Sequence, residues 1–553
     1  MLSWFKRRQQ PSAVESAPDQ PERPDEQARR TYDEALECCA RGDHAQAEAL
    51  VRTAIDLQHD FVDAHMLLGQ LCHARRAYEE AEDSFALASC FAPASGEPHF
   101  RLGLMAMDRG EFVQAEALLR KAMELEPGHA RAHNAAGAAM LNLERLDAAR
   151  AHFERALALD PGFVEAHSNL GYLLYRDFEE FEQGEQHIRR ALELAPENVD
   201  VLTNLSMIMR DRPEEVITLA DRLLTRNADL DSVRLNRGLA LLKLGQFQRG
   251  WADYEARKSV RCNYVPRAMP WPEWDGSSLS GRAIYVHTEQ GLGDEIMFAS
   301  CLPEVIAAAD HCVVECSPKL LKTFRRSFDA EVVLKPRHDA ELSTAARQRV
   351  DCYSALGGLP RFLRATESAF PRHTGYLRPD AIRVDRWRQK LAALPGALKV
   401  GVAWRGGVPS TQRSMRSTSL EDWLPILAIE GADFVDLQHF ESAEELARLR
   451  DRHDISVHRW NDAHDDYDET AALVSALDLV ISVQTALVHL SGALGKETGA
   501  VISAAPEWRY LARGERMPWY PAVRLVRQTA LRDWRGPVEA VASQLRERVR
   551  GYR

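Results

Sequence analysis

The first half of the chain repeats one pattern of small residues, bulky residues and prolines. Gly69, Gly103, Gly137 and Gly171 recur every 34 residues, and Pro93, Pro127 and Pro161 recur at the same interval. Between each glycine and the next proline, two alanines flank one bulky residue in register: Ala81, Phe85, Ala88; Ala115, Leu119, Ala122; Ala149, Phe153, Ala156. Small residues let two helices approach closely, and proline ends a helix. The pattern predicts stacked helical hairpins, each with a bulky residue that fills the next hairpin.

The second half changes to short apolar segments that alternate with helical ones. The expected strands are Ala283 to His287, Cys312 to Cys316, Glu331 to Leu334, Lys399 to Trp404, Phe434 to Gln438 and Leu479 to Val483. The expected helices are Asp294 to Ala309, Pro318 to Phe328, Leu420 to Ile429, Ser442 to Asp451, Glu469 to Leu477 and Thr485 to Leu494. Two successive series of this kind predict two doubly wound lobes with a ligand cleft at their strand ends.

These patterns divide the chain into five segments. Residues 1–27 are rich in Pro, Gln, Glu and Ser and are predicted to be a disordered tail. Residues 28–258 form the repeats, and 259–282 form a linker because prolines, glycines and tryptophans interrupt the helical pattern. The two lobes are then expected at 283–395 and 396–553. The repeats resemble the tetratricopeptide repeat, an α-solenoid whose concave face binds peptides or proteins.

Composition narrows the classes of function. Seventy Lys and Arg against 82 Asp and Glu give a net charge of −12, which argues against a general nucleic-acid binder. The nine cysteines are scattered and include no Cys-x-x-Cys pair, a pattern typical of free thiols in a reducing compartment. No segment approaches the roughly 20 apolar residues that span a bilayer, and no signal peptide is apparent. We therefore expect a cytoplasmic protein.

Two glycine-rich or small-residue turns follow expected strands and open helices. One reads EQGLGDEIMFASCLP from Glu289 to Pro303, and the other reads DLVISVQTALVHLSGALG from Asp478 to Gly495. Such turns direct backbone N–H groups and the helix dipole at an anion. The pair predicts one phosphate-bearing ligand between the two lobes.

Several segments together carry a family resemblance. EQGLGDEIMF, VGVAWRGG, MRSTSLEDW, DLQ, DLVISVQTALVHLSGALG, PEWRY and MPWYPAVRLVRQ resemble those of bacterial tetratricopeptide-repeat glycosyltransferases, whose catalytic half is similar to the heptosyltransferases. The resemblance implies an α plus α/β fold: a tetratricopeptide solenoid followed by a two-lobed glycosyltransferase B (GT-B) domain. The lobe at 283–395 would then take the acceptor, and that at 396–553 the nucleotide sugar. Some proteins of this architecture glycosylate flagellin.

The catalytic candidates lie at the first turn. Sugar transfer with inversion needs a base near the acceptor hydroxyl. Asp294 follows Gly291 and Gly293, and in heptosyltransferases the matching Asp is regarded as the base, although the same carboxylate can simply cap its helix. Glu295 is the neighbouring alternative, and Glu289 at the strand exit is a weaker one.

The donor candidates come mainly from the second lobe. Transfer also needs positive charge or N–H donors at the departing phosphate. Besides Gly291 and Gly293, the resemblance and the anion-site geometry select six residues: Arg416, Gln438, Gln484, Thr485, Ala486 and His489. The family generally has Asp at the position of Gln484, where it contacts sugar hydroxyls, so heptose specificity is not implied. Gln438 suits equally a nucleoside contact or a loop-capping amide.

The acceptor candidates are three asparagines of the repeats. Asn169, Asn204 and Asn236 each precede the small residue of their repeat by two positions. Side-chain amides offer a donor and an acceptor to a peptide backbone, and the arrangement resembles the asparagine ladder of O-linked N-acetylglucosamine transferases. Ordinary helix-surface asparagines are the alternative. The expected partners are a protein acceptor, for which the resemblance suggests flagellin, and a nucleotide-activated sugar as donor substrate.

No metal or separate cofactor is expected. Asp466-Tyr467-Asp468 spells the Asp-x-Asp metal motif of other transferases, but it precedes an expected helix, where Asp is an ordinary cap. Two other functions stay open. One is a heptosyltransferase-like enzyme with a lipid or polysaccharide acceptor, and the other is a non-catalytic repeat scaffold with decayed transferase lobes.

Overall fold

The computed structural model describes residues 23–209, 211–260, 267, 269–334, 350–406, 413–531 and 533–552. The chain divides into two compact units between Leu205 and Ser206. The predicted tail lies outside the described residues up to residue 22. Helix α1 (Pro24–Arg41) starts with a proline in its first turn, so residues 24–27 belong to the first helix and not to the tail.

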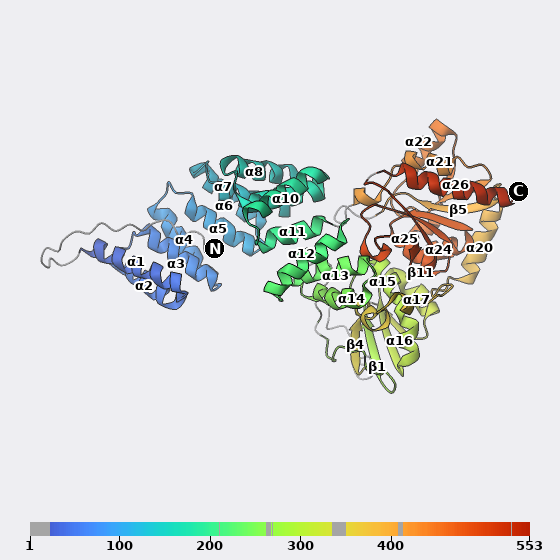
Figure 1. The fold of residues 1–553 in the computed structure, drawn as a ribbon, viewed down its shortest axis with the longest axis horizontal. Coiled ribbons are helices and arrows are strands. Elements are labelled where there is room, and N and C mark those ends of the chain that lie inside the picture. Colours follow the sequence, from blue (N-terminus) through green and yellow to red (C-terminus); the bar gives the residue numbers. More distant parts are fainter. Residues whose placement is uncertain are drawn as a thin grey trace. The chain divides into compact units, whose positions relative to one another are not determined.

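The first unit is built from antiparallel helical hairpins (Figure 1). Its helices are α1, α2 (His44–Leu57), α3 (Val62–Ala74), α4 (Tyr78–Phe91), α5 (Glu97–Asp108), α6 (Phe112–Leu125), α7 (Ala130–Asn142), α8 (Leu146–Leu159), α9 (Val164–Leu173) and α10 (Phe181–Leu194), with α11 (Val199–Ile208) across the division. The second helix of three hairpins ends just before Pro93, Pro127 or Pro161, as the repeat pattern predicts.

The bulky residue of each repeat packs within its own hairpin. A Cβ added to Gly69 would lie 2.6 Å from the ring of Phe85, and one added to Gly137 would lie 2.6 Å from that of Phe153. Both rings are almost fully buried. The same rings also reach the next hairpin, as the sequence predicts, since Phe85 shares a core cluster with Met105 of α5 and Phe153 shares one with Leu170 of α9.

The second unit begins with the last repeat helices. These are α12 (Pro213–Arg226), α13 (Asp231–Lys243) and α14 (Phe247–Tyr254). The boundary predicted at 258 does not separate them from the sheets, because Trp251 and Tyr254 of α14 pack in one core with Phe298, Trp508 and Trp519. The Trp251 indole also donates a 2.9 Å hydrogen bond to the carbonyl of Arg364.

A four-stranded parallel sheet follows, in the order β3-β2-β1-β4. Its strands are β1 (Ala283–His287), β2 (His311–Cys316), β3 (Glu331–Leu334) and β4 (Cys352–Ala355), with helices α15 (Leu292–Phe298), α16 (Leu302–Ala308), α17 (Leu321–Ser327) and α19 (Pro360–Leu363). The segment predicted as a linker belongs to this lobe: Trp274 is buried in its core, and the Trp274 N–H donates to the carbonyl of Tyr353 at 2.7 Å.

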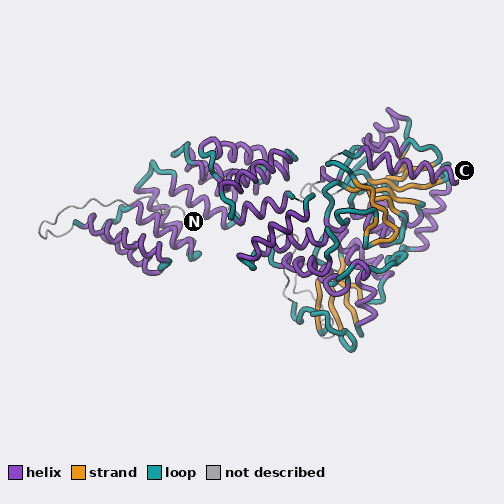
Figure 2. The backbone as a smooth tube through the Cα atoms, in the orientation of Figure 1, coloured by secondary structure: helices purple, strands orange, loops and turns teal. Residues whose placement is uncertain are grey.

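A seven-stranded sheet completes the unit, in the order β10-β11-β9-β8-β5-β6-β7, parallel except for the β10–β11 pair. Figure 2 draws the strands of this unit in orange among purple helices. Its strands are β5 (Leu398–Ala403), β6 (Ala432–Asp436), β7 (Val457–His458), β8 (Leu479–Val483), β9 (Thr498–Ile502), β10 (Arg516–Met517) and β11 (Tyr520–Arg527). Its helices are α20 (Ala381–Ala392), α21 (Leu424–Leu427), α22 (Ala443–His453), α23 (Asp462–Asp465), α24 (Tyr467–Ala476), α25 (Ala486–Ala493) and α26 (Arg535–Tyr552).

Helices cover both faces of this sheet. Alternate residues of β8 enter two cores, with Val480 among residues of α20 and α24, and Ile481 among residues of α21 and α26. The lobe boundary predicted at 395/396 is therefore too late, because Val384 and Trp387 of α20 pack on the second sheet. One predicted helix is also broken: a 3₁₀ turn at Ala299–Cys301 separates α15 from α16, where Pro303 lacks the N–H that would continue α15.

In the part of the chain that the structure describes, no helix combines the length and apolar character needed to cross a bilayer.

Candidate functional site

The turn after β1 positions Asp294 in the first turn of α15. Gly291 is the N-cap residue, and its carbonyl accepts from the N–H groups of Asp294 and Glu295 at 2.9 Å each. The Asp294 side chain is 18% exposed, so most of it is withdrawn from water. Asp294 thus places a largely shielded carboxylate at a helix start.

The turn after β8 positions Thr485 as the N-cap of α25. Its hydroxyl accepts from the N–H of Leu487 at 3.1 Å and lies 3.1 Å from the hydroxyl of Ser482. Ala486 is the first residue of the helix, and His489 is buried one turn later.

The two helix starts meet. A Cβ added to Gly293 would lie 3.2 Å from Cδ2 of His489 and 3.5 Å from Cα of Ala486. Gly293 therefore lets the first turn of α15, from the four-stranded sheet, approach α25, from the seven-stranded sheet. Gly406 does the same after β5, because a Cβ there would lie 2.7 Å from Cγ2 of Thr485.

A row of alternating charges runs beside this junction. Arg416 and Glu507 are joined at 2.5 Å, Glu507 and Arg509 at 2.9 Å, and Arg509 and Asp294 at 2.5 Å. Burial raises the pKa of Asp294 above its ordinary value, while the Arg509 guanidinium acts in the opposite direction. Arg416, Arg509 and the largely shielded Asp294 thus lie in the region where the sequence predicts a phosphate site and a catalytic base.

His489 is held neutral in this junction. Burial, with the nearby Arg509 charge, lowers the pKa of His489 to about 3. Its Nδ1 lies 3.2 Å from the hydroxyl of Tyr520. A neutral imidazole can contact a phosphate only through an N–H, without contributing charge.

Two predicted site residues are engaged elsewhere. Glu295 accepts from the N–H of Ser317 at 2.9 Å and from its hydroxyl at 2.5 Å, which directs the carboxylate to the turn before α17 and away from a role as substitute base. Gln438 accepts from the N–H groups of Trp404 and Arg405 and donates to the carbonyl of Arg405. Of the two roles considered for Gln438, a nucleoside contact and a loop-capping amide, these hydrogen bonds fit the loop-capping amide.

The side chains of Gln484 and Glu289 are buried, and each makes a hydrogen bond through only one of its two terminal atoms among the described residues. Gln484 Oε1 accepts from the N–H of Ser503 at 3.0 Å, while its Nε2 has no hydrogen-bond partner among the described residues. Glu289 accepts from Arg257 at 2.9 Å. Burial raises the pKa of Glu289, against the effect of that guanidinium.

The three asparagines of the repeats form hydrogen bonds between successive repeats. In the first unit, Asn169 donates to Asn134 Oδ1 at 3.0 Å, and Asn204 donates to the hydroxyl of Ser168 at 2.9 Å. In the second unit, Asn236 donates to the hydroxyl of Ser206 at 2.8 Å. All three asparagines are half-buried. Asn134 joins this row although it precedes Gly137 by three positions, whereas the other asparagines precede their small residue by two.

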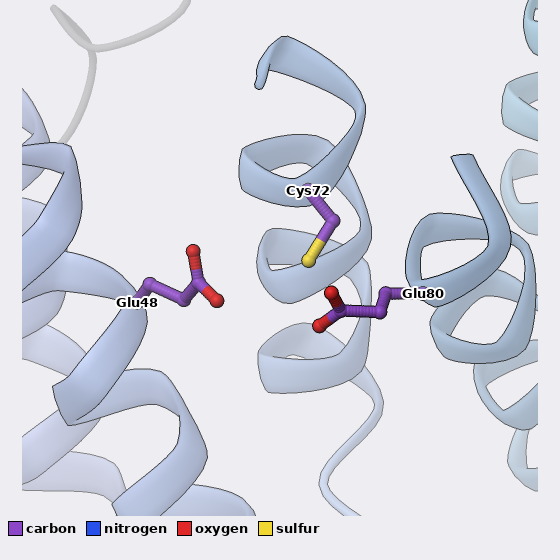
Figure 3. Close-up of side chains that lie close together, drawn as sticks. All are labelled: Glu48, Cys72 and Glu80. Carbon is purple, nitrogen blue, oxygen red and sulfur yellow. The ribbon is translucent and has the colours of Figure 1, made fainter. Parts of the chain in front are cut away.

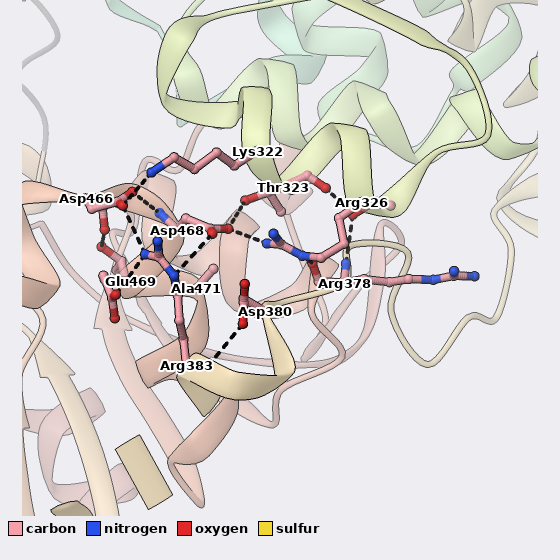
Figure 4. A network of polar contacts seen from close by, with 12 residues as sticks. Lys322, Thr323, Arg326, Arg378, Asp380, Arg383, Asp466, Asp468, Glu469 and Ala471 are labelled. Carbon is pink, nitrogen blue, oxygen red and sulfur yellow. Dashed lines mark hydrogen bonds and ion pairs between the residues drawn. The ribbon is translucent and has the colours of Figure 1, made fainter. Parts of the chain in front are cut away.

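The Asp-x-Asp sequence serves the helix cap and an ion-pair network (Figure 4). Asp466 is the N-cap of α24 and accepts from the N–H of Asp468 at 2.9 Å, as the sequence predicts. Asp466 also pairs with Lys322 at 2.8 Å and Arg383 at 3.0 Å. Asp468 is bonded to Thr323 and Arg326.

One other cluster has metal-ligating side chains. Glu48, Cys72 and Glu80 bring their ligand atoms within 4.8 Å of one another (Figure 3). Arg52 and Arg75 each pair with both carboxylates at 2.6–3.1 Å. Because two guanidinium groups already neutralise the two carboxylates, the cluster is an ion-pair network between neighbouring helices.

Sequence reasoning missed Glu507 and Arg509 as members of the charged row. Both lie in PEWRY, which entered the sequence analysis only as part of the family resemblance, and the tryptophan between them, Trp508, packs in the core. The sequence signal that could have identified them is the pair of opposite charges, Glu507 and Arg509, on either side of Trp508.

Comparison with known proteins gives the class of the helical half. Residues 32–98 and 106–170 each match the tetratricopeptide repeat family. The first half of the chain therefore contains tetratricopeptide repeats, and its second half holds parallel sheets and helices.

Among individual proteins, the chain is similar to Protein FlbA of Caulobacter vibrioides, with 32% identity over 335 residues. The match covers 58% of this chain and spans 56% of the length of that relative. It extends beyond the repeats, since residues 1–258 alone cannot supply 335 positions.

Two solved structures are similar to part of the chain at low identity. PilF of Pseudomonas aeruginosa is 20% identical, with 42% of this chain and 99% of that chain covered and a TM-score of 0.32. MamA of Desulfovibrio magneticus RS-1 is 19% identical, with 31% and 97% covered and a TM-score of 0.28.

Proposed function

We propose that this protein is a protein O-glycosyltransferase with a GT-B catalytic half, which transfers a sugar from a nucleotide-activated donor to a Ser or Thr hydroxyl. The observation that carries the proposal is the meeting of α15 and α25 at Gly293. A carboxylate from one sheet and a helix start with a nearby arginine from the other converge there, as a two-lobed sugar transfer requires.

In the proposed mechanism the donor phosphates bind at the start of α25. Thr485 and the N–H of Ala486 face the phosphate at the positive end of the helix dipole, and neutral His489 donates an N–H. Arg416 supplies charge, and a phosphate would compete with Glu507 for its guanidinium, which is 2.5 Å from that carboxylate.

Asp294 then acts as the base. Its carboxylate accepts the proton of the acceptor hydroxyl while the oxygen attacks the anomeric carbon and the bond to the phosphate breaks. Charge that develops on the leaving phosphate is stabilised by Arg416 and the helix start, so the mechanism needs no metal. Attack from the face opposite the phosphate inverts the anomeric centre.

The repeats provide a reason to propose a protein acceptor. Tetratricopeptide repeats bind peptides and proteins on their concave face, and the half-buried Asn169, Asn204 and Asn236 lie in register on the first helices of their hairpins. We propose that they contact the acceptor backbone with their amide oxygens. Flagellin is the first acceptor to test, on the strength of the resemblance to flagellin-modifying enzymes.

The test compares intact masses of proteins that copurify with the full-length chain from cells that carry wild type, Asp294→Asn or Asp329→Asn. Asp329 is an exposed carboxylate and is the matched control. Loss of a base costs about 10²–10⁴-fold in rate. We expect sugar-sized mass increments on a bound protein with wild type and Asp329→Asn, and a loss of at least about 100-fold with Asp294→Asn.

The other outcomes separate the rival functions. A bound protein of equal mass in all three strains would favour a non-catalytic scaffold. Sugar increments confined to a lipid or polysaccharide fraction, and dependent on Asp294, would favour the heptosyltransferase-like alternative.

A further inference from the structure

One ion pair at the junction joins the two sheets through the proposed base itself. Asp294 lies on α15 of the four-stranded lobe, and Arg509 lies in a 3₁₀ turn, Trp508–Tyr510, between β9 and β10 of the seven-stranded lobe. Arg509 Nη1 donates to Asp294 Oδ1 at 2.5 Å. The two side chains are 15% and 18% exposed, so the pair is largely shielded from solvent.

We propose that Arg509 is a positioning residue for Asp294: it fixes the orientation of the carboxylate and keeps it ionised although the docked lobes withdraw it from water. This inference rests on the proposed function and extends it. It assigns the second lobe a role in the base chemistry as well as in donor binding.

The neighbouring groups explain why one guanidinium matters. Tyr254 of α14 and Tyr510 lie near Asp294 and are neutral, because burial raises the pKa of both phenols, and His489 of α25 is neutral as well. Glu507 contributes negative charge, and Arg416 positive charge from behind Glu507. Arg509 is therefore the cation in direct contact with Asp294.

Without that contact the buried carboxylate would hold its proton. An ionised group removed from water is destabilised unless a partner of opposite charge compensates. Burial acts on Asp294 in this direction, and Arg509 opposes it. A protein that keeps the two lobes in contact but lacks the guanidinium would therefore carry a protonated acid in place of a base.

The lobes also carry a second set of contacts that fixes this docking. Arg509 is held from its own side by Glu507 at 2.9 Å. Trp508, next to it, packs at 5.5 Å from Trp251 and at 6.2 Å from Phe298 of α15. The turn is thus anchored by aromatic packing while its charged residue reaches the opposite lobe.

The test measures the protonation of Asp294 directly, without any need for substrate. Aspartate labelled with ¹³C at the side-chain carboxyl is incorporated into the full chain, and the Asp294 signal is assigned by its loss in Asp294→Asn. Carboxyl titrations are then compared for wild type, Arg509→Gln, Arg509→Lys, Glu507→Gln and Arg513→Gln. Arg513, whose side chain is 89% exposed, is the matched control from the same segment.

We expect Asp294 in Arg509→Gln to titrate at a pH higher than in wild type by about one unit or more, the usual effect of losing an adjacent opposite charge. Arg509→Lys should restore most of the wild-type titration, and Arg513→Gln should match it. Glu507→Gln should move the titration downward, because a like charge is removed, and it tests the same pair if Arg509→Gln does not fold. An unchanged titration in Arg509→Gln or in Glu507→Gln would overturn the inference.

The pH dependence of sugar transfer separates this inference from the proposed function. With an active enzyme, the acid limb of kcat/KM should move to higher pH in Arg509→Gln, since a base must be deprotonated to act. If the Asp294 titration shifts in Arg509→Gln but the protein transfers no sugar, the role of Arg509 is supported and the proposed transferase function is rejected. Sugar transfer with an unmoved titration and acid limb would reject the Arg509 role alone.

Discussion

The glycine of each helical hairpin is required by the side chain that faces it. Gly137 illustrates the constraint, since an added Cβ would lie 2.6–3.0 Å from three ring atoms of Phe153. Phe153 is fully buried, so its ring has no free space into which to move. Close-packed interiors respond to an extra methyl group with strain.

Gly137→Ala should therefore lower the free energy of unfolding by about 1–3 kcal/mol, as overpacking of a core usually does. Gly128→Ala is the control, because a Cβ there meets nothing within 4 Å, and it should change stability by less than about 0.5 kcal/mol. Urea unfolding of the full chain, followed by circular dichroism, measures both. A smaller side chain opposite should compensate, so Gly137→Ala with Phe153→Leu should recover stability relative to Gly137→Ala alone; no recovery would contradict the steric explanation.

The position of a single site residue could be predicted from the sequence where the residue lies within a recognisable local pattern. Asp294 and Thr485 follow strand-turn-helix patterns, and both lie at helix starts. Gln438 and Glu295 bind backbone groups of neighbouring loops instead, and no local pattern encodes the distant N–H that claims a side chain. Arg509 was missed for the same reason, because its partner Asp294 is in the other lobe.

At the scale of elements, a recurring histidine links each repeat to the preceding one. His65, His133 and His167 each lie four positions before the hairpin glycine. The Nε2 of His65 lies 2.8 Å from the carbonyl of His59, and that of His167 lies 3.1 Å from the carbonyl of Pro161. These carbonyls follow a helix end, where acceptors lack intrahelical partners.

Two of these histidines also meet a histidine of the second helix. The Nδ1 atoms of His133 and His152 are 3.3 Å apart, and those of His167 and His187 are 2.9 Å apart. Such a distance suits one neutral ring donating to the other and opposes protonation of both. Burial lowers the pKa of His133, His152 and His187 below the ordinary 6.5.

The first unit should consequently lose stability as the pH falls below about 6.5. The unfolded chain binds protons there that the folded pairs do not, so the free energy of unfolding rises with pH across this range. Thermal unfolding followed at pH values from about 7.5 to about 5.5 should show a falling Tm. His152→Asn should reduce that slope, whereas His44→Gln, at an exposed site, should not; equal slopes in wild type and His152→Asn would contradict the role of the pairs.

Elements with a strict period were predicted best. The helices of the repeats and the strands β1, β3 and β8 fall where the pattern places them. The antiparallel pair β10 and β11 and the helix α20 were not predicted, although α20 spaces its buried Val384, Trp387 and Leu391 at helical intervals. Their positions are set by packing on the second sheet.

At the scale of the whole sheet-containing unit, polar contacts between α17 and α24 join the two lobes at a place remote in sequence from Asp294 (Figure 4). Asp468 is buried, and its carboxylate accepts from the hydroxyl of Thr323 at 2.8 Å and from the guanidinium of Arg326. A buried carboxylate with these partners is costly to disturb because its neighbours lose their acceptor.

Asp468→Asn should reduce the stability of this unit by about 1–3 kcal/mol, the cost of leaving buried polar groups imperfectly paired. Hydrogen exchange should increase in α17 as well as in α24, although the substitution lies in only one of the two lobes. Asp465→Asn, at an exposed position in the same segment, is the control. Increased exchange limited to α24 would contradict a role in joining the lobes.

The placement of the last repeat helices restricts how such proteins can exchange parts in evolution. The backbone carbonyl of Lys243 in α13 accepts a 2.7 Å hydrogen bond from the N–H of Ala512. Trp251 of α14 lies in the core beside Trp508 and Trp519. A recombination junction at residue 258 would separate these aromatic rings from the partners they were selected with. An exchange of repeats that leaves this core intact must therefore fall upstream of α12, so that α12 to α14 stay together with the sheets.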